Sequence, residues 1–113
     1  MRPSRGEVWL TDFDPTVGHE QSGRRPCLIV SDDDFNHGPF EMVVVMPLTT
    51  RDKARKLRVL VSPPQGGLRS DSFVMPDMIR AISTQRLIAL WGVVDETVLD
   101  EVEMKTKAIL GLR

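Results

Sequence analysis

The densest group of chemically capable side chains lies in residues 18–26, which read Gly-His-Glu-Gln-Ser-Gly-Arg-Arg-Pro. Glycine and polar residues dominate this segment, so it is expected to be a surface loop. Arg25 precedes Pro26, and a residue before proline is restricted to extended conformations, which fixes the start of its side chain. His19, Glu20, Gln21 and Arg25 thus suit acid–base chemistry or phosphate binding, although composition alone fits a solvated loop equally well.

A second polar group follows an apolar run that ends at Pro47-Leu48. Its hydroxyls at Thr49 and Thr50 are of the kind that donate to phosphate oxygens, and basic side chains behind them would hold a nucleic-acid backbone. The basic residues are Arg51, Lys53, Arg55, Lys56 and Arg58. Lysine and arginine also protect exposed sheet edges, so this interpretation stays open beside the first. Asp77, between Pro76 and Met78, reads most simply as a turn former.

Metal and cofactor sites are not expected. His19 and His37 are isolated, and the run Asp32-Asp33-Asp34 lacks the spacing of a calcium loop. The sequence has no phosphate-binding glycine loop and no serine-nucleophile elbow. Cys27 lies within an apolar run and is expected to be inert, while the two tryptophans and six methionines are assigned to the core.

Short apolar runs separated by turn residues predict a mainly β protein. Proline at 47 is expected to end or kink its strand. Asp95 as N-cap and Gly111 as C′ residue bound an amphipathic C-terminal helix. Expected strands are Glu7–Leu10, Cys27–Val30, Met42–Met46, Leu57–Val61, Ser72–Met75, Met78–Ile82 and Leu87–Val94. Many short strands and one terminal helix favour a small barrel or half-barrel closed by that helix.

The 113 residues suit a single domain spanning 1–113, with 41% hydrophobic and 27% charged residues. One cysteine gives no intramolecular disulfide, and the N-terminus does not resemble a signal peptide. Apolar stretches of about five residues are too short to span a bilayer, so a cytoplasmic location is expected. The net charge of −1 gives no bulk indication of a nucleic-acid partner.

Three segments carry a resemblance to MazF/PemK-type toxins. They are residues 5–9 (Arg-Gly-Glu-Val-Trp), 14–23 (Asp-Pro-Thr-Val-Gly-His-Glu-Gln-Ser-Gly) and 25–30 (Arg-Pro-Cys-Leu-Ile-Val). Residues 45–50, 77–83 and the amphipathic C-terminal helix agree more loosely, so the resemblance spans essentially the whole chain. It implies an SH3-like β-barrel with helices, a homodimer, and a cognate antitoxin that blocks the RNA groove.

The resemblance also implies an activity, the sequence-specific cleavage of single-stranded RNA without a metal. A ribose 2′-hydroxyl attacks the adjacent phosphorus and leaves a 2′,3′-cyclic phosphate and a 5′-hydroxyl. The catalytic positions of the family match Arg25 and Thr49, with His19 at a position that varies among relatives. Glu20 and Gln21 match loop positions that shape the RNA groove. The chain departs from the family at Met78, often glutamine, and at Met75, where some relatives carry an arginine.

The chemistry assigns a role to each matched residue. A guanidinium has a pKa above ~12, so Arg25 is expected to stabilise charge on the phosphorane rather than act as a base. Thr49 would donate to a non-bridging oxygen, and His19 would accept the 2′-hydroxyl proton. Two alternatives stay open. One is a barrel toxin that binds DNA gyrase without catalysis, and the other is a plain SH3-like interaction domain.

Overall fold

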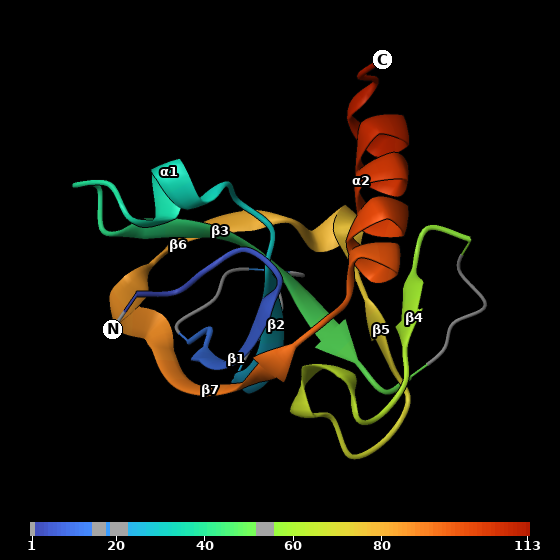
Figure 1. Cartoon of the computed structure of the whole chain (residues 1–113), viewed down its shortest axis with the longest axis horizontal. Helices are drawn as coiled ribbons and strands as arrows, with labels where there is room; N and C mark the ends of the chain where they lie inside the picture. The colour runs from blue at the N-terminus through green and yellow to red at the C-terminus, as the bar shows by residue number, and fades with distance from the viewer. Residues whose placement is uncertain (1, 15–17, 19–22, 52–55) are drawn as a thin grey trace.

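The computed structural model describes residues 2–14, 18, 23–51 and 56–113. In this part of the chain seven strands, two α-helices and three short 3-10 turns follow one another (Figure 1). The strands are β1 (Glu7–Asp12), β2 (Arg24–Ile29), β3 (Met42–Thr49), β4 (Val59–Val61), β5 (Ser72–Val74), β6 (Arg80–Ser83) and β7 (Leu87–Val93). The helices are α1 (Asp33–Asn36) and α2 (Glu96–Leu110), and the turns are η1 (Gln65–Gly67), η2 (Pro76–Met78) and η3 (Thr84–Arg86).

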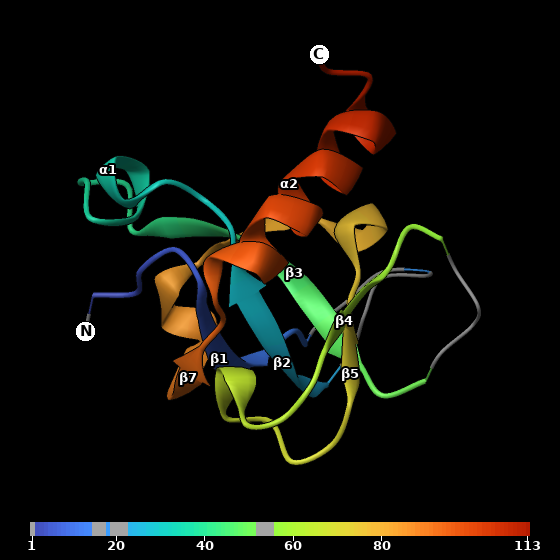
Figure 2. The same ribbon diagram turned by 45° about the vertical axis from the view of Figure 1, so that its right-hand side comes forward.

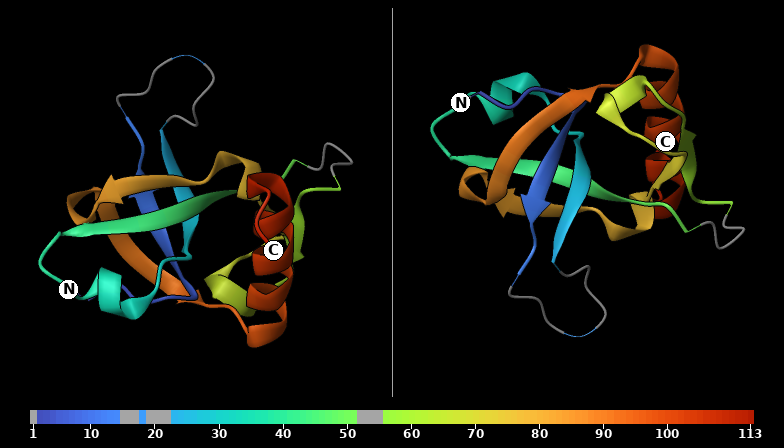
Figure 3. Two further views of the ribbon diagram at one scale, coloured as in Figure 1. Left: turned by 90° about the horizontal axis from the view of Figure 1, so that it is seen from above. Right: turned by 90° about the horizontal axis from the view of Figure 1, so that it is seen from below.

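The strands form one antiparallel sheet in the order β4-β5-β3-β2-β1-β7, with β6 added to β3 off this path. The sheet curls, and α2 lies beside β4 at its side (Figures 1 and 2). The left panel of Figure 3, which shows the molecule from above, shows the strands curving round a shared interior, with α2 packed against one side. The predicted mainly β half-barrel with a C-terminal helix is therefore confirmed.

Strand β3 runs further than predicted, and Pro47 lies inside it rather than at its end. The reason is a change of partner. The first part of β3 pairs with β6 as far as Val45 opposite Arg80, and the last part pairs with β5 from Leu48 opposite Val74. Pro47 sits between these two ladders, where a missing N–H costs little, while its carbonyl still accepts from the Met75 N–H at 3.0 Å.

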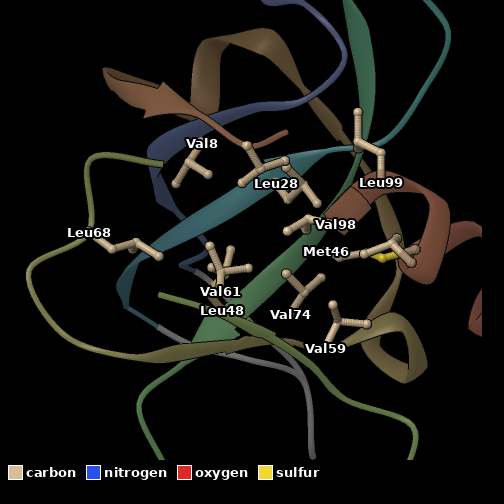
Figure 4. Packing of buried hydrophobic residues seen from close by; sticks show 12 residues of the cluster. Val8, Leu28, Met46, Leu48, Val59, Val61, Leu68, Val74, Val98 and Leu99 are labelled. Carbon is tan, nitrogen blue, oxygen red and sulfur yellow. The ribbon is translucent and has the colours of Figure 1, made fainter. Parts of the chain in front are cut away.

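Alternation along the strands divides the core into two clusters, because successive side chains point to opposite faces. On one face Leu28, Met46 and Leu48 meet residues of α2, including Val98 and Leu99 (Figure 4). On the other face lie Trp9, Phe13, Cys27, Ile29, Val43, Val45, Ile82 and Leu87. Each cluster is nearly closed to solvent, so the sheet is packed on both faces.

The C-terminal helix begins and ends where the sequence predicted. The Asp95 carboxylate accepts a hydrogen bond from the Val98 N–H at 3.0 Å, and Gly111 ends the helix with φ of 70°. Lys105 fastens the helix to the sheet, since its Nζ lies 2.7 Å from the Arg58 carbonyl oxygen that it donates to. No helix among the described residues has the length and hydrophobicity needed to cross a bilayer.

Three predictions made from composition are wrong. Residues 33–36 form the short helix α1, whose N-cap Asp32 accepts from the Asp34 N–H, where only a break in the pattern was expected. Trp91 is 41% exposed and Met104 is 62% exposed, so neither belongs to the core. Apolar character identifies residues that favour burial, but roughly half of any folded surface is apolar, and position decides which ones are buried.

The turn η1 packs directly against β7, and this contact requires glycine. A Cβ on Gly67 would lie 2.1 Å from the Trp91 carbonyl oxygen, and one on Gly92 would lie 2.6 Å from the Gly67 nitrogen. Gly67 also has φ of +65°, which disfavours any other residue. The backbones of η1 and β7 are therefore in direct contact, and the space at Gly67 and Gly92 leaves no room for a side chain between them.

We predict that Gly67→Ala lowers the free energy of unfolding by about 2–4 kcal/mol, because steric overlap adds to left-handed strain. Gly111→Ala is the matched control, since φ is +70° but a Cβ added there would meet nothing within 4 Å. It should cost about 1–2 kcal/mol from strain alone. Urea denaturation of both variants checks this. Equal losses would show that the contact with Trp91 contributes nothing.

Candidate active site

The antiparallel pairing of β2 with β3 brings the start of β2, which carries Arg25, and the end of β3, which carries Thr49, to the same end of the sheet. Cys27 lies opposite Pro47 and Leu28 opposite Met46, and the β2–β3 ladder ends at the Cys27–Pro47 pair. Extended by two residues past that pair, the same register would set Arg25 opposite Thr49. Residues that face each other across antiparallel strands project from the same side of the sheet. Both side chains are half-buried.

The hydroxyl of Thr49 is oriented by its own chain. The Arg51 backbone N–H donates to Thr49 Oγ1 at 3.2 Å. A hydroxyl oxygen that accepts this bond still has its hydrogen to donate elsewhere. Thr49 therefore keeps a hydrogen-bond donor, which suits a group that binds a phosphate oxygen.

Below Arg25 the sheet is dry and neutral. Thr11, opposite Arg25 on β1, is fully buried, and its hydroxyl donates to the Trp9 carbonyl at 3.0 Å. Thr11 Oγ1 lies 2.7 Å from Cys27 Sγ. Burial raises the pKa of the Cys27 thiol to about 12, and the hydrogen bond between Cys27 and Thr11 opposes that rise. Cys27 is therefore a neutral thiol at physiological pH, as expected from the sequence, and supports the site without reacting.

Backbone bonds close the base of the predicted site loop. The Phe13 N–H donates to the Gly23 carbonyl at 2.9 Å, and the Gly23 N–H donates to Asp14 Oδ1 at 2.9 Å. Arg86 holds the same region, since its Nη1 donates to the carbonyls of Asp12 and Asp14 at 3.2 and 2.8 Å. Hydrogen bonds therefore hold Phe13 and Asp14 before the loop and Gly23 after it, and β2 begins directly after Gly23.

Arg80 is a second guanidinium that the residue pattern did not single out. It begins β6 opposite Val45, on the face that also carries Ile82 and Val43. Its guanidinium carbon lies 5.4 Å from the centre of the Phe13 ring, a cation–π arrangement. The signal was present in the sequence, because Arg80 stands two residues before Ile82 and so falls on the inward side of a predicted strand.

The predicted RNA-binding residues fall into three groups. Thr50, Arg51 and Lys56 are exposed near the end of β3 and the start of β4. Asp77 lies in η2, where its carboxylate pairs with Arg58 at 3.2 Å. The Arg58 side chain is only 12% exposed, so this member of the basic cluster serves the fold. His19, Glu20, Gln21, Lys53 and Arg55 lie outside the described residues.

Among the described ranges, no three His, Cys, Asp or Glu side chains gather closely enough to hold a metal ion. A guanidinium and a hydroxyl donor at the same end of a sheet are the side-chain types that suit the binding of a phosphate group.

Comparison with known proteins identifies a family whose model matches nearly the whole chain. A family model described as "PemK-like, MazF-like toxin of type II toxin-antitoxin system" matches residues 4–110. Endoribonuclease PemK of Escherichia coli is 39% identical, covering 94% of this chain and 80% of its own length. Endoribonuclease MazF9 of Mycobacterium tuberculosis is 33% identical, covering 96% of each.

Solved structures agree on the fold. MazF of Deinococcus radiodurans superposes with a TM-score of 0.87 at 28% identity, covering 99% of both chains. A MazE–MazF structure from the same organism gives 0.81 at 29% identity, covering 100% of this chain and 99% of the other. The match of sequence, fold and element order leads to one conclusion: the chain belongs to the PemK-like, MazF-like toxins of type II toxin–antitoxin systems.

Proposed function

We propose that this chain is a toxin endoribonuclease that cuts single-stranded RNA at a specific sequence without a metal ion. The observation that supports the proposal most directly is the antiparallel β2–β3 pairing, which sets the start of β2 with Arg25 and the end of β3 with Thr49 at the same end of the sheet. Two relatives of the chain carry the names Endoribonuclease PemK and Endoribonuclease MazF9. The family assignment also favours this activity over the gyrase-binding alternative.

The reaction needs charge stabilisation more than it needs a nucleophile from the protein. The ribose 2′-hydroxyl of the RNA attacks the adjacent phosphorus, and the bond between phosphorus and O5′ breaks. The products are a 2′,3′-cyclic phosphate on one fragment and a 5′-hydroxyl on the other. Negative charge grows on the non-bridging oxygens as the phosphorane forms, and Arg25 meets it with a planar set of donors. Thr49 donates to one of those oxygens.

Proton transfer is assigned to His19 in this proposal. Imidazole titrates near neutral pH, so it is suited to take the 2′-hydroxyl proton, whereas a guanidinium is already protonated and cannot accept one. Arg25 serves the leaving oxygen as a stabiliser and acid. His19 falls in the chain between Phe13 and Gly23, and the backbone bond that joins these two residues lies at the start of β2, which supports its assignment to the same site.

RNA binding extends from the catalytic pair over the neighbouring loops. We assign Glu20 and Gln21 to the shape of the groove, and Thr50, Arg51, Lys53, Arg55 and Lys56 to the RNA backbone. The exposure of Thr50, Arg51 and Lys56 supports their part of this assignment. We also assign Asp77 to RNA binding; its carboxylate is held by the ion pair with Arg58.

The proposal includes a cognate antitoxin as the inhibitor. The mycobacterial endoribonuclease that shares this fold was solved in complex with its cognate antitoxin, and the toxin of Deinococcus radiodurans was solved with MazE. An antitoxin segment that covers the Arg25–Thr49 end of the sheet would exclude RNA by occupying the same surface.

Arg25→Ala is expected to reduce cleavage about 10²–10³-fold, the usual cost of losing a donor to a transition-state oxygen. Arg113→Ala is the control. Arg113 is also an exposed arginine but lies beyond the C-terminal end of α2, outside every residue assigned to the site, so its loss should change the rate by less than about threefold. Both variants should keep the parental circular dichroism spectrum. Parental activity in a folded Arg25→Ala protein would refute the assignment.

The chemistry of the cut is tested with one RNA in two forms. Excess EDTA should leave cleavage unchanged, and replacement of the ribose 5′ of the cut by deoxyribose should abolish it, because the nucleophile is lost. The 3′ fragment should accept label from a polynucleotide kinase without phosphatase treatment. A two-metal hydrolase behaves in the opposite way. Cleavage of the deoxy-substituted RNA would rule out the proposed mechanism.

The active form is proposed to be a homodimer. A domain of this size offers little surface for gripping several nucleotides, and large hydrophobic side chains stay exposed on the described surface, among them Phe40, Met104 and Leu112. Sedimentation equilibrium at micromolar concentration should return about twice the chain mass of 12.7 kDa. A monomer at that concentration would contradict this part of the proposal.

A further inference from the structure

A cavity of about 640 Å³ opens at the same end of the sheet as Arg25 and Thr49. Its volume falls within the ordinary range for small-ligand sites. The described residues that line it are Pro26, Thr50, Gly67, Leu68, Arg69, Ser70, Ser72, Leu90 and Trp91. They come from β2, from the segment after β3, from the η1 region and from β7.

The lining combines an aromatic ring, one cation and several hydroxyls. Trp91 is 41% exposed and offers an indole face, while Leu90 adds apolar surface. Arg69 alone is charged among the described lining residues. Single-stranded RNA is recognised by this chemistry, since unpaired bases stack on aromatic rings or guanidinium planes and hydrogen-bond through their edges.

The cavity lies one residue from the catalytic pair on both strands. Pro26 follows Arg25 and Thr50 follows Thr49, and neighbouring Cα atoms are about 3.8 Å apart. Alternation turns Pro26 to the face opposite Arg25. An RNA strand that crosses this end of the sheet therefore meets Arg25 and Thr49 on one side and the cavity on the other.

The position of Trp91 is fixed by close backbone contact. Gly67 and Gly92 allow η1 and β7 to touch, which the right panel of Figure 3 shows as the η1 turn beside the end of β7. Gln65 tightens the same region, because its Oε1 accepts from the Asp95 N–H at 2.8 Å. A rigid aromatic platform loses little conformational entropy on binding, which favours a specific ligand.

We propose that this cavity binds one base of the RNA substrate, one or two nucleotides from the cleaved bond, with Trp91 as the stacking surface and Arg69 at its phosphate. The inference rests on the proposed endoribonuclease function and adds a site that helps to choose the sequence. A single positive side chain beside an aromatic surface favours an anionic, aromatic ligand, and a nucleotide has both properties.

The test uses a short RNA that the protein cuts, in which one nucleotide at a time is replaced by an abasic ribose. Binding is measured on copies with deoxyribose at the cut. In the wild-type protein, one abasic position near the cut should weaken binding by about 5- to 150-fold, the range that a stacked base supplies. In Trp91→Ala the same abasic change should have little further effect, because the stacking partner is already gone.

Three more variants sharpen the result. Trp91→Phe keeps an aromatic ring and should retain most of the binding. Arg69→Gln should reduce the slope of log affinity against log salt concentration by about 0.7, the value for one phosphate contact on a single strand. Ile88→Ala is the matched control, since Ile88 is exposed on β7 but does not line the cavity.

Fluorescence gives an independent reading in the intact protein. The two tryptophans differ, since Trp9 is 7% exposed and Trp91 is 41% exposed. Binding of the uncut RNA should quench the emission of the wild-type protein, and Trp91→Phe should abolish most of that quenching. A merely structural role for Trp91 would not make quenching depend on the base that the abasic series identifies.

The outcomes separate this inference from the proposed function. A wild-type protein that does not cut RNA refutes the proposed function. Cutting with no abasic effect that depends on Trp91 refutes the cavity assignment alone. Loss of binding in Trp91→Ala together with a changed oligomeric state also overturns it, since Trp91 would then serve an interface between copies. A cavity used by a protein partner would leave both RNA measurements unchanged and overturn it as well.

Discussion

The register between β2 and β3 is the constraint on which the rest of the structure depends. A shift of one residue would turn every side chain of β2 to the other face of the sheet. Leu28 would then leave the cluster packed against α2, and Cys27 would leave the opposite one. The same shift would move Arg25 away from Thr49. Core packing therefore fixes the register, and the register positions the two residues of the proposed catalytic pair at no separate cost in stability.

Strand β3 connects the β2–β3 pair to two further strands, β6 and β5. It pairs with β2 along one side, and with β6 and then β5 along the other. Pro47 marks the change of partner, and the residues beyond it run directly to Thr49. The end of β3 is thus held by β5, which pairs with Leu48 and Thr49, while β2 pairs with β3 as far as Pro47. This strand pairing orders the backbone of Thr49, which supports its proposed role as a phosphate donor.

The sequence predicted the elements well where the signal is local. Apolar runs located the strands, and Asp95 and Gly111 located both ends of α2, because capping depends on neighbouring residues. Arg25 and Thr49 were named from residue type and resemblance, and the register supports placing them together. Contacts between distant residues were not predictable in this way. Arg58 and Asp77 are 19 residues apart in the chain, and nothing local pairs them.

The same lack of information on contacts between distant residues explains why Trp91 and Arg80 were not placed correctly from the sequence. Trp91 was assigned to the core because tryptophan is usually buried, yet β7 lies at the edge of the sheet. Arg80 was overlooked because one charged residue in an alternating strand suggests exposure. Its guanidinium instead lies over the ring of Phe13, which is itself fully buried. Alternation could have given the inward face of Arg80, but its partner Phe13 and the edge position of β7 become evident only in the folded sheet.

In the proposed function, the two faces at this end of the sheet separate catalysis from the choice of RNA sequence. Arg25 and Thr49 belong to strands whose register is fixed by two cores, so on this proposal substitutions there would disturb catalysis or folding. The cavity beside Trp91 is lined partly by the segment from Gly67 to Ser72, which lies outside the strands that carry the catalytic pair. Changes in that segment alter the shape and polarity of the cavity while the β2–β3 register stays intact. A fold of this kind can acquire new sequence preferences without rebuilding its reactive centre, because the two tasks rest on different parts of the chain.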